Sequence, residues 1–189
     1  MRVCNDVLFT DLIKGYLMAR VLPSILLGLL ASASITSQAA EISGAVGVTS
    51  QGDMTYRAGL GWEWDKRWCE SSIGHFGGYW DVGYTYWEGG DQASGRHSIS
   101  AAPVFEYVIG DGFYRPFIEV GIGASLFSGT GVGDRKMGSV FNFEDRLGAG
   151  LKIGEAQKVG VRVIHYSNAG LAQPNAGVES YSLFYAHQF

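Results

Sequence analysis

The segment Tyr114-Arg-Pro-Phe-Ile-Glu-Val-Gly-Ile-Gly-Ala-Ser-Leu126 alternates between two kinds of side chain. Successive side chains of a β-strand point to opposite faces, so residues two apart share a face. One face of this segment carries only Tyr, Pro, Ile, Val, Ala and Leu, whereas the other carries charged residues, glycine, serine and one Phe. The segment is therefore predicted to be a strand with one apolar face and one face of charge and glycine.

The same pattern recurs along the chain after residue 40. In the second segment, Tyr56, Leu60 and Trp62 lie opposite Arg57 and Gly59. The composition, with 28 Gly, 10 Phe and 10 Tyr, also favours an all-β fold. Clusters of Gly, Asp, Asn and Ser separate the segments, and the predicted strands are 41–50, 54–65, 76–88, 95–107, 113–127, 138–153, 157–168 and 178–189.

The width of a small barrel determines which face points inward. An eight-stranded barrel has an interior only just wide enough for side chains to fill, and long rows of Ile, Leu, Tyr and Trp would overfill it. Glycine and Arg/Glu pairs fit such a lumen, so the apolar rows face hydrocarbon, and closure leaves no unpaired strand edge in lipid. The predicted fold is an all-β, eight-stranded antiparallel transmembrane β-barrel of the bacterial outer membrane.

The strand ends agree with this fold. Aromatic residues near them suit the interfacial girdles of such barrels: Trp62, Trp64, Trp80, Trp87, Tyr107 and Tyr114. The chain ends in Phe189, which resembles the assembly signal of bacterial outer-membrane barrels. We therefore expect outer-membrane lipids as the surroundings and the barrel assembly machinery as a partner through Phe189.

Residues 1–39 have the features of an export leader. An apolar run at 21–31 follows Arg20 and precedes Ser37-Gln38-Ala39, which has the small-x-Ala form of a signal-peptidase site. Met18 is the expected true start of this leader, so residues before it come from a start codon placed too early.

The expected mature chain, residues 40–189, has the length of a single domain. Cys69 is its only cysteine, so no internal disulfide is expected. The whole chain has a formal net charge of −4 at pH 7. This charge argues against nucleic acid as a partner, because such partners usually require a basic face.

Loop lengths predict the direction of the strands. Outer-membrane barrels keep periplasmic turns short and external loops long. The connections 108–112 and 154–157 are short, whereas 128–137 and 169–177 are longer. The seventh strand is therefore predicted to run outward. The connection 66–75 is too long for a periplasmic turn and does not fit this scheme.

A candidate catalytic group lies at the outer end of the seventh strand. His165 and Ser167 are two apart on one face, and Glu179 begins the next strand on the matching face. If residue 165 or 167 lies opposite 179 across the hairpin, the facing Cβ atoms are about 5 Å apart. A serine activated by a histidine that a carboxylate orients is the arrangement of a serine hydrolase. The following loop offers oxyanion donors, the backbone N–H of Gly170 and the side-chain amide of Asn175.

Each of these residues also has a structural interpretation. A His at a strand end is usually interfacial, and Ser-Asn before Ala-Gly is usually a turn. Their common position on the lipid-facing row favours catalysis, because unpaired polar groups are penalised there. The alternative function is a non-enzymatic eight-stranded barrel for adhesion or structure, followed by a calcium-dependent outer-membrane phospholipase and a soluble small-ligand barrel.

The C-terminal motifs resemble the PagL family of outer-membrane lipid A 3-O-deacylases. They are His165-Tyr-Ser-Asn-Ala-Gly170, Pro174-Asn-Ala-Gly177, Glu179 and the terminal Phe189, and Phe141-Asn-Phe-Glu-Asp-Arg-Leu-Gly148 is similar to the family's sixth strand. The resemblance implies a triad of His165, Ser167 and Glu179. It also implies an oxyanion hole at Gly170 and Asn175, with Asn168 as a candidate supporting residue.

The same resemblance implies the substrate and the setting. The expected reaction is hydrolysis of the ester that holds the 3-hydroxyacyl chain at position 3 of lipid A, with release of a 3-hydroxy fatty acid. Lipopolysaccharide is the expected partner, the active site faces the outer leaflet, and a homodimer is left open. No cofactor is expected, and no metal-ligand spacing joins the remaining histidines, His75, His97 and His187.

The Gly-rich tract 128–134 is not followed by a predicted helix, which argues against a phosphate-binding loop. We expect a mobile external loop there. Arg135 and Lys136 are candidates for contacts with the phosphates of lipid A, although a solvated charged loop tip is the simpler interpretation.

Overall fold

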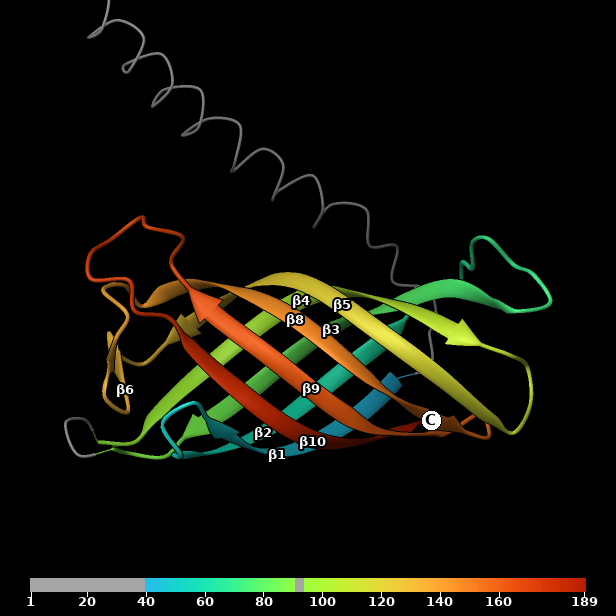
Figure 1. The fold of residues 1–189 in the computed structure, drawn as a ribbon, viewed down its shortest axis with the longest axis horizontal. Coiled ribbons are helices and arrows are strands. Elements are labelled where there is room, and N and C mark those ends of the chain that lie inside the picture. The colour runs from blue at the N-terminus through green and yellow to red at the C-terminus, as the bar shows by residue number, and fades with distance from the viewer. Residues whose placement is uncertain (1–39, 91–93) are drawn as a thin grey trace, which may run out of the picture. The chain divides into compact units, whose positions relative to one another are not determined.

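The computed structural model describes residues 40–90 and 94–189, which form a closed antiparallel β-barrel (Figure 1). Its eight strands are β1 (Ala40–Thr49), β2 (Met54–Glu63), β3 (Gly74–Trp87), β4 (Arg96–Ile109), β5 (Tyr114–Phe127), β8 (Phe141–Ile153), β9 (Gln157–Ser167) and β10 (Val178–Gln188). Pairing of β1 with β10 closes the barrel. Within these residues, no helix is long and apolar enough to cross a membrane. The predicted eight-stranded antiparallel barrel is confirmed.

The predicted strand bounds agree with the structure to within three residues. The connection between β5 and β8 differs from the expected loop, because it contains a two-stranded hairpin of β6 (Gly131–Val132) and β7 (Arg135–Lys136). The Gly133-Asp134 pair between them is a two-residue hairpin signal that could have predicted it. The expected leader lies outside the described residues, so the division into leader and barrel domain stays a prediction.

The two faces of the strands point as predicted, except that Trp87, expected in an interfacial girdle, lies on the inward row of β3 and is 1% exposed. On β5, Ile118 and Ile122 are exposed on the outer surface, whereas Glu119 between them is 1% exposed and faces the lumen. On β9, Val161 is exposed and its neighbour Arg162 is buried. The outer surface is therefore apolar and the interior holds the charged groups.

The charged side chains of the lumen are paired with one another. Asp81 accepts hydrogen bonds from both Arg57 and Arg146, and Nη2 of Arg146 lies 2.6 Å from its carboxylate. Glycine leaves room for these groups, because a Cβ at Gly83 would lie 2.1 Å from the guanidinium of Arg57. Further lumen pairs are Arg146 with Glu144, Arg162 with Glu119, Lys158 with Glu41 and Glu106, and Lys152 with Glu106. Buried charges are thus neutralised locally, as burial requires.

The barrel end that carries residues 168–177, here called the loop end, is closed by apolar side chains. The buried cluster consists of Trp87, Phe127, Val132, Met137, Ile164, Tyr166 and Val178. Val132 and Met137 come from the β6–β7 hairpin and its following residue, so this hairpin covers the mouth of the barrel (Figure 1). The Tyr166 hydroxyl donates to Glu144 at 3.0 Å and joins the cluster to the charged lumen.

The long connection 66–75 folds back along β3 at the opposite end. Trp68 forms an isolated antiparallel bridge with Phe76. The indole of Trp64 occupies the space that a Cβ at Gly78 would fill, and its ring packs edge-on against Trp80. The connection is long because it builds an aromatic surface on the outside of the barrel, which its length alone did not reveal.

Candidate active site

The β9–β10 hairpin brings His165 and Glu179 together. These residues are directly opposite each other in the antiparallel register, and both point outward. His165 Nδ1 lies 2.9 Å from Glu179 Oε1. Their side chains are 39% and 27% exposed. The pair is thus accessible from the barrel exterior, and the carboxylate fixes the tautomer in which Nε2 carries no proton.

Ser167 lies on the same outward row of β9, two residues beyond His165 and at the last position of the strand. Its hydroxyl makes no hydrogen bond to the described residues, so Ser167 Oγ is not hydrogen-bonded to His165 Nε2 in this structure. Such contacts are often long in the absence of substrate. Its cross-strand neighbour on β8 is Phe143, whose ring stands edge-on to Phe141 at 5.3 Å. The serine therefore has an apolar wall on one side.

Asn168 shapes the loop that follows Ser167. This side chain is fully buried. Its Nδ2 donates to the carbonyl oxygens of Met137 at 2.6 Å and Ala172 at 3.0 Å. Its Oδ1 accepts the N–H of Gly170 at 2.9 Å. The Asn168 side chain therefore holds the loop together through hydrogen bonds and connects it to Met137, the residue that follows β7.

Gly170 and Asn175 differ in their availability as donors. The Gly170 N–H already donates to Asn168, and Gly170 has a left-handed backbone with φ of 81°. Asn175 Oδ1 accepts the N–H of Asn168 at 3.1 Å. No hydrogen bond within residues 40–90 and 94–189 uses Asn175 Nδ2, so this amide is free to donate to a ligand.

Sequence reasoning missed two polar residues beside the site. Ser50, in the β1–β2 turn, donates to Glu179 Oε2 at 3.3 Å. Asp145 on β8 is paired with His165 from the side opposite Glu179, and it is exposed on the outer row. A charged residue in a lipid-facing row is the signal that could have identified Asp145, whereas nothing in the local sequence marks Ser50.

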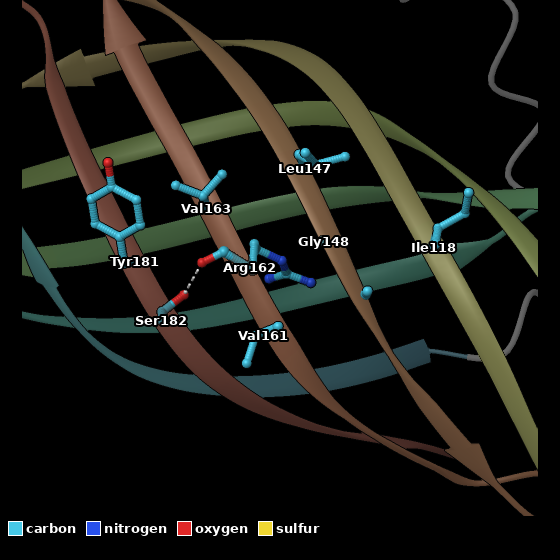
Figure 2. A pocket seen from close by; sticks show the side chains of 9 residues that line it. Ile118, Leu147, Gly148, Val161, Arg162, Val163, Tyr181 and Ser182 are labelled. Atoms are coloured by element: carbon cyan, nitrogen blue, oxygen red, sulfur yellow. Dashed lines mark hydrogen bonds between the residues drawn. The ribbon is translucent and has the colours of Figure 1, made fainter.

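An apolar groove of about 590 Å³ lies on the outer surface between β5 and β10. Its lining residues are Ile118, Leu147, Gly148, Ala149, Val161, Arg162, Val163, Tyr181 and Ser182. Figure 2 shows Leu147, Val161 and Val163 around its middle, with Tyr181 and Ile118 at its two sides. Val163 is two residues from His165 on the same row of β9, so the groove leads away from the His165–Glu179 pair. Its volume is in the range of ligand sites.

Comparison with known proteins assigns the chain to a family. The family model described as lipid A 3-O-deacylase (PagL) matches residues 50–188. The chain belongs to the PagL family. It is 60% identical over 169 residues to the lipid A deacylase PagL of Pseudomonas aeruginosa, covering 89% of this chain and 98% of that protein. The resemblance found in the sequence is confirmed.

Two further PagL relatives agree. The lipid A deacylase PagL of Bordetella bronchiseptica is 36% identical over 170 residues, which cover 85% of this chain and 92% of that protein. The crystal structure of the outer membrane enzyme PagL superposes with a TM-score of 0.76 at 62% identity, over 77% of this chain and 97% of that chain. The barrel of this chain is therefore the barrel of the PagL enzymes.

The remaining candidates of this PagL-family chain are Arg135, Lys136 and the other histidines. Arg135 is half-buried and donates to Ser50, so it is not a solvated loop tip, whereas Lys136 is exposed. Among the described residues, no group of three or more His, Cys, Asp or Glu is placed to hold a metal ion. Of the other histidines, His97 Nδ1 contacts the Tyr84 hydroxyl at 2.6 Å on the outer face of β3 and β4.

Proposed function

We propose that this protein is a lipid A 3-O-deacylase of the outer membrane that works by a Ser-His-Glu mechanism. It hydrolyses the ester that holds the 3-hydroxyacyl chain at position 3 of lipid A and releases a 3-hydroxy fatty acid. The observation that carries the proposal is the 2.9 Å contact between His165 and Glu179 beside Ser167, on the outward face of a PagL-family barrel. The apolar packing of the outer surface does not require a polar, hydrogen-bonded pair, so we assign the pair to function.

In this mechanism Glu179 accepts the hydrogen bond of His165 Nδ1–H, which leaves Nε2 as the base. Ser167 Oγ attacks the ester carbonyl while Nε2 takes its proton. The imidazolium then protonates the leaving oxygen of the sugar, and an acyl-serine remains. Water, deprotonated by the same Nε2, attacks the acyl-serine, and the returning proton regenerates Ser167. No step requires a group from outside the chain except the substrate and water.

Asn175 is the main oxyanion donor in this proposal. Its Nδ2 is unused, whereas the Gly170 N–H must share or release its bond to Asn168 before it can reach an oxyanion. A preorganised donor of this kind contributes roughly 3 kcal/mol to transition-state stabilisation in hydrolases. Asn168 supports both by fixing the path of the loop.

The apolar groove supports an acyl-chain path along the barrel exterior. It begins near His165 and follows the outward row of β9 through Val163 and Val161. A substrate in the outer leaflet can thus keep its acyl chain in hydrocarbon while its ester reaches Ser167. In this proposal the active site faces the outer leaflet, where lipopolysaccharide resides.

Other parts of the proposal concern the chain ends. Phe189 is 76% exposed, and its N–H donates to Ala40 O at 2.9 Å. Such a ring is accessible to the barrel assembly machinery. We also propose that residues 1–39 are a cleaved leader with Met18 as the true start and that residues 40–189 are the mature domain. A homodimer remains a prediction.

Mass spectrometry of lipid A tests the function. Cells expressing the wild-type chain are expected to lose one 3-hydroxyacyl group from lipid A, with or without EDTA, and cells expressing Ser167→Ala are expected to retain it. Unmodified lipid A in both strains, with both proteins folded in the outer membrane, would favour the non-enzymatic barrel. Modification that EDTA abolishes would favour a calcium-dependent enzyme.

A further inference from the structure

We propose that Ser50, oriented by Arg135, is a positioning residue that holds the carboxylate of Glu179 in the catalytic geometry. The inference rests on the proposed deacylase function and extends it to a turn and a hairpin far from β9 in sequence. Ser50 lies in the β1–β2 turn and is 129 residues from Glu179. It touches no reacting atom, so its role is to orient the acid.

The first step of the argument concerns the two oxygens of Glu179. Oε1 accepts from His165 Nδ1 at 2.9 Å, and Oε2 accepts from the Ser50 hydroxyl at 3.3 Å. A carboxylate held at one oxygen can still rotate about its terminal torsion, which has broad preferences. The second bond restricts that rotation, so the acceptor stays aimed at the imidazole.

Arg135 decides which way the Ser50 hydroxyl points. Its Nη2 lies 3.4 Å from Ser50 Oγ. A guanidinium has no acceptor atom, so it only donates, whereas a hydroxyl has one proton and two acceptor lone pairs. Ser50 must therefore accept from Arg135, and its single proton is left for Glu179. The chain of donors runs from Arg135 through Ser50 to Glu179.

The β1–β2 turn gives Ser50 a fixed position. Thr49 N–H donates to Asp53 O at 2.8 Å, and Gly52 N–H donates back to Thr49 O at 3.1 Å. The Thr49 hydroxyl also accepts the N–H groups of Gln51 and Asp53, both at 3.2 Å. Ser50 thus belongs to a turn whose backbone is bonded on both sides of it.

The β6–β7 hairpin holds Arg135 against that turn. The Asp134 N–H donates to Gln51 Oε1 at 3.3 Å. Gly133 permits this approach, because its φ is 53° and a Cβ there would lie 2.3 Å from Asp53 Oδ2. The hairpin is therefore fitted to the turn and is not a freely solvated loop.

The same hairpin is also bonded to the oxyanion loop. Lys136 O accepts the Ala176 N–H at 3.2 Å, next to Asn175. Met137 O accepts from Asn168 Nδ2 at 2.6 Å. One hairpin thus contacts both the residue that orients Glu179 and the loop that supplies the oxyanion donor.

The test compares Ser50→Ala and Ser50→Thr with the wild-type protein in detergent micelles containing lipid A. Ser50→Ala is expected to lower kcat roughly tenfold with little change in KM, because a hydrogen bond to a charged group is lost without loss of a substrate contact. Ser50→Thr keeps the hydroxyl and is expected to restore kcat. Arg135→Gln is expected to lower kcat about threefold. Ser72→Ala, an exposed serine at the opposite end, is the matched control without effect.

A second readout separates positioning from a general structural effect. The rate at which a small sulfonyl fluoride labels Ser167 reports activation of the serine without lipid binding. Ser50→Ala is expected to slow labelling in the wild-type background but not in the Glu179→Ala background, because Ser50 acts only through the Glu179 carboxylate. Equal slowing in both backgrounds, or unchanged kcat in a folded Ser50→Ala protein, would overturn the inference.

The outcomes distinguish this inference from the proposed function. If Ser167→Ala and the wild type have the same activity, the deacylase mechanism itself fails. If Ser167→Ala is inactive and Ser50→Ala is fully active, only the role of Ser50 fails. Heat-modifiable gel mobility checks folding, and if Ser50→Ala does not fold, Arg135→Gln with wild-type kcat and labelling rate rejects the donor chain.

Discussion

The inner and outer faces of this barrel both carry polar side chains, but under opposite conditions. Inside, Asp81 is 3% exposed and contacts two arginines, Arg57 and Arg146. Outside, His165 and Glu179 form one hydrogen-bonded pair at the edge of an apolar surface. Burial without pairing is costly inside, so each charged group there is part of a network. The outer row has no such need for polar groups.

The difference indicates where function lies in a small membrane barrel. Charged residues in the lumen satisfy one another and stabilise the closed sheet. A polar group on the lipid-facing surface is penalised, so its presence requires a separate reason. At the loop end, polar residues on the outer face of β8, β9 and β10 include Asp145, His165, Ser167 and Glu179. The outer face, and not the charged interior, is therefore the place to look for catalysis.

The largest expected effect is the loss of activity when His165 is replaced. His165 points outward from β9, whereas its neighbour Tyr166 points inward. His165→Asn is expected to lower kcat/KM roughly 10⁴-fold or more, because it removes the proposed general base. Unfolding in urea should be little changed, since the side chain is partly exposed. Steady-state hydrolysis of lipid A by purified protein measures the first quantity, and the urea midpoint in detergent measures the second.

Tyr166→Phe is the inward-facing control for this prediction. It removes the hydroxyl that donates to Glu144 at 3.0 Å. A loss of about 2 kcal/mol in the free energy of unfolding is expected, with unchanged kcat. Equal losses of activity in the two variants would mean that the two faces are not functionally distinct.

The second prediction compares two aspartates on the two faces. Asp81→Asn leaves two buried arginines without their shared anion and is expected to lower the free energy of unfolding by about 3–5 kcal/mol. Asp145→Asn removes a charge that has no ion pair among the described residues, so its stability effect is expected near zero. Urea unfolding followed by tryptophan fluorescence checks both. A similar loss in the two variants would contradict the assignment of the lumen network to stability.

The barrel and the outward row of β9 could be predicted from sequence, because both follow from the two-residue alternation of side chains along a strand. Alternation from Tyr114 to Leu126 fixes which side chains share a face, and a small barrel can hold only glycine, charge and a few aromatic rings inside. The same counting placed His165 and Ser167 on one row. The counting left open whether residue 165 or 167 faces Glu179 across the hairpin, and the structure pairs Glu179 with His165.

The loops could not be predicted in the same way, because they have no period. The Gly170 N–H was expected to be free, yet it donates to Asn168. Ser50 contacts Glu179 only because β1 closes the barrel against β10, a contact between distant parts of the chain. Such contacts depend on closure and on turn geometry, which local sequence patterns do not report.

The smallest of these effects concerns a glycine that makes room for the imidazole of His165. Gly177 has a φ of 63°, and a Cβ there would lie 2.8 Å from His165 Cε1. Gly177→Ala is expected to lower kcat roughly tenfold, since a left-handed alanine costs about 1–2 kcal/mol and the methyl group displaces the ring. Gly110→Ala, with a φ of 77° and open space around it, imposes the same backbone strain without touching the site. Kinetics and urea unfolding of both variants are compared. If both lose stability and both keep kcat, the space beside His165 is not required for the reaction, and the outer face tolerates more change than its hydrogen bonds suggest.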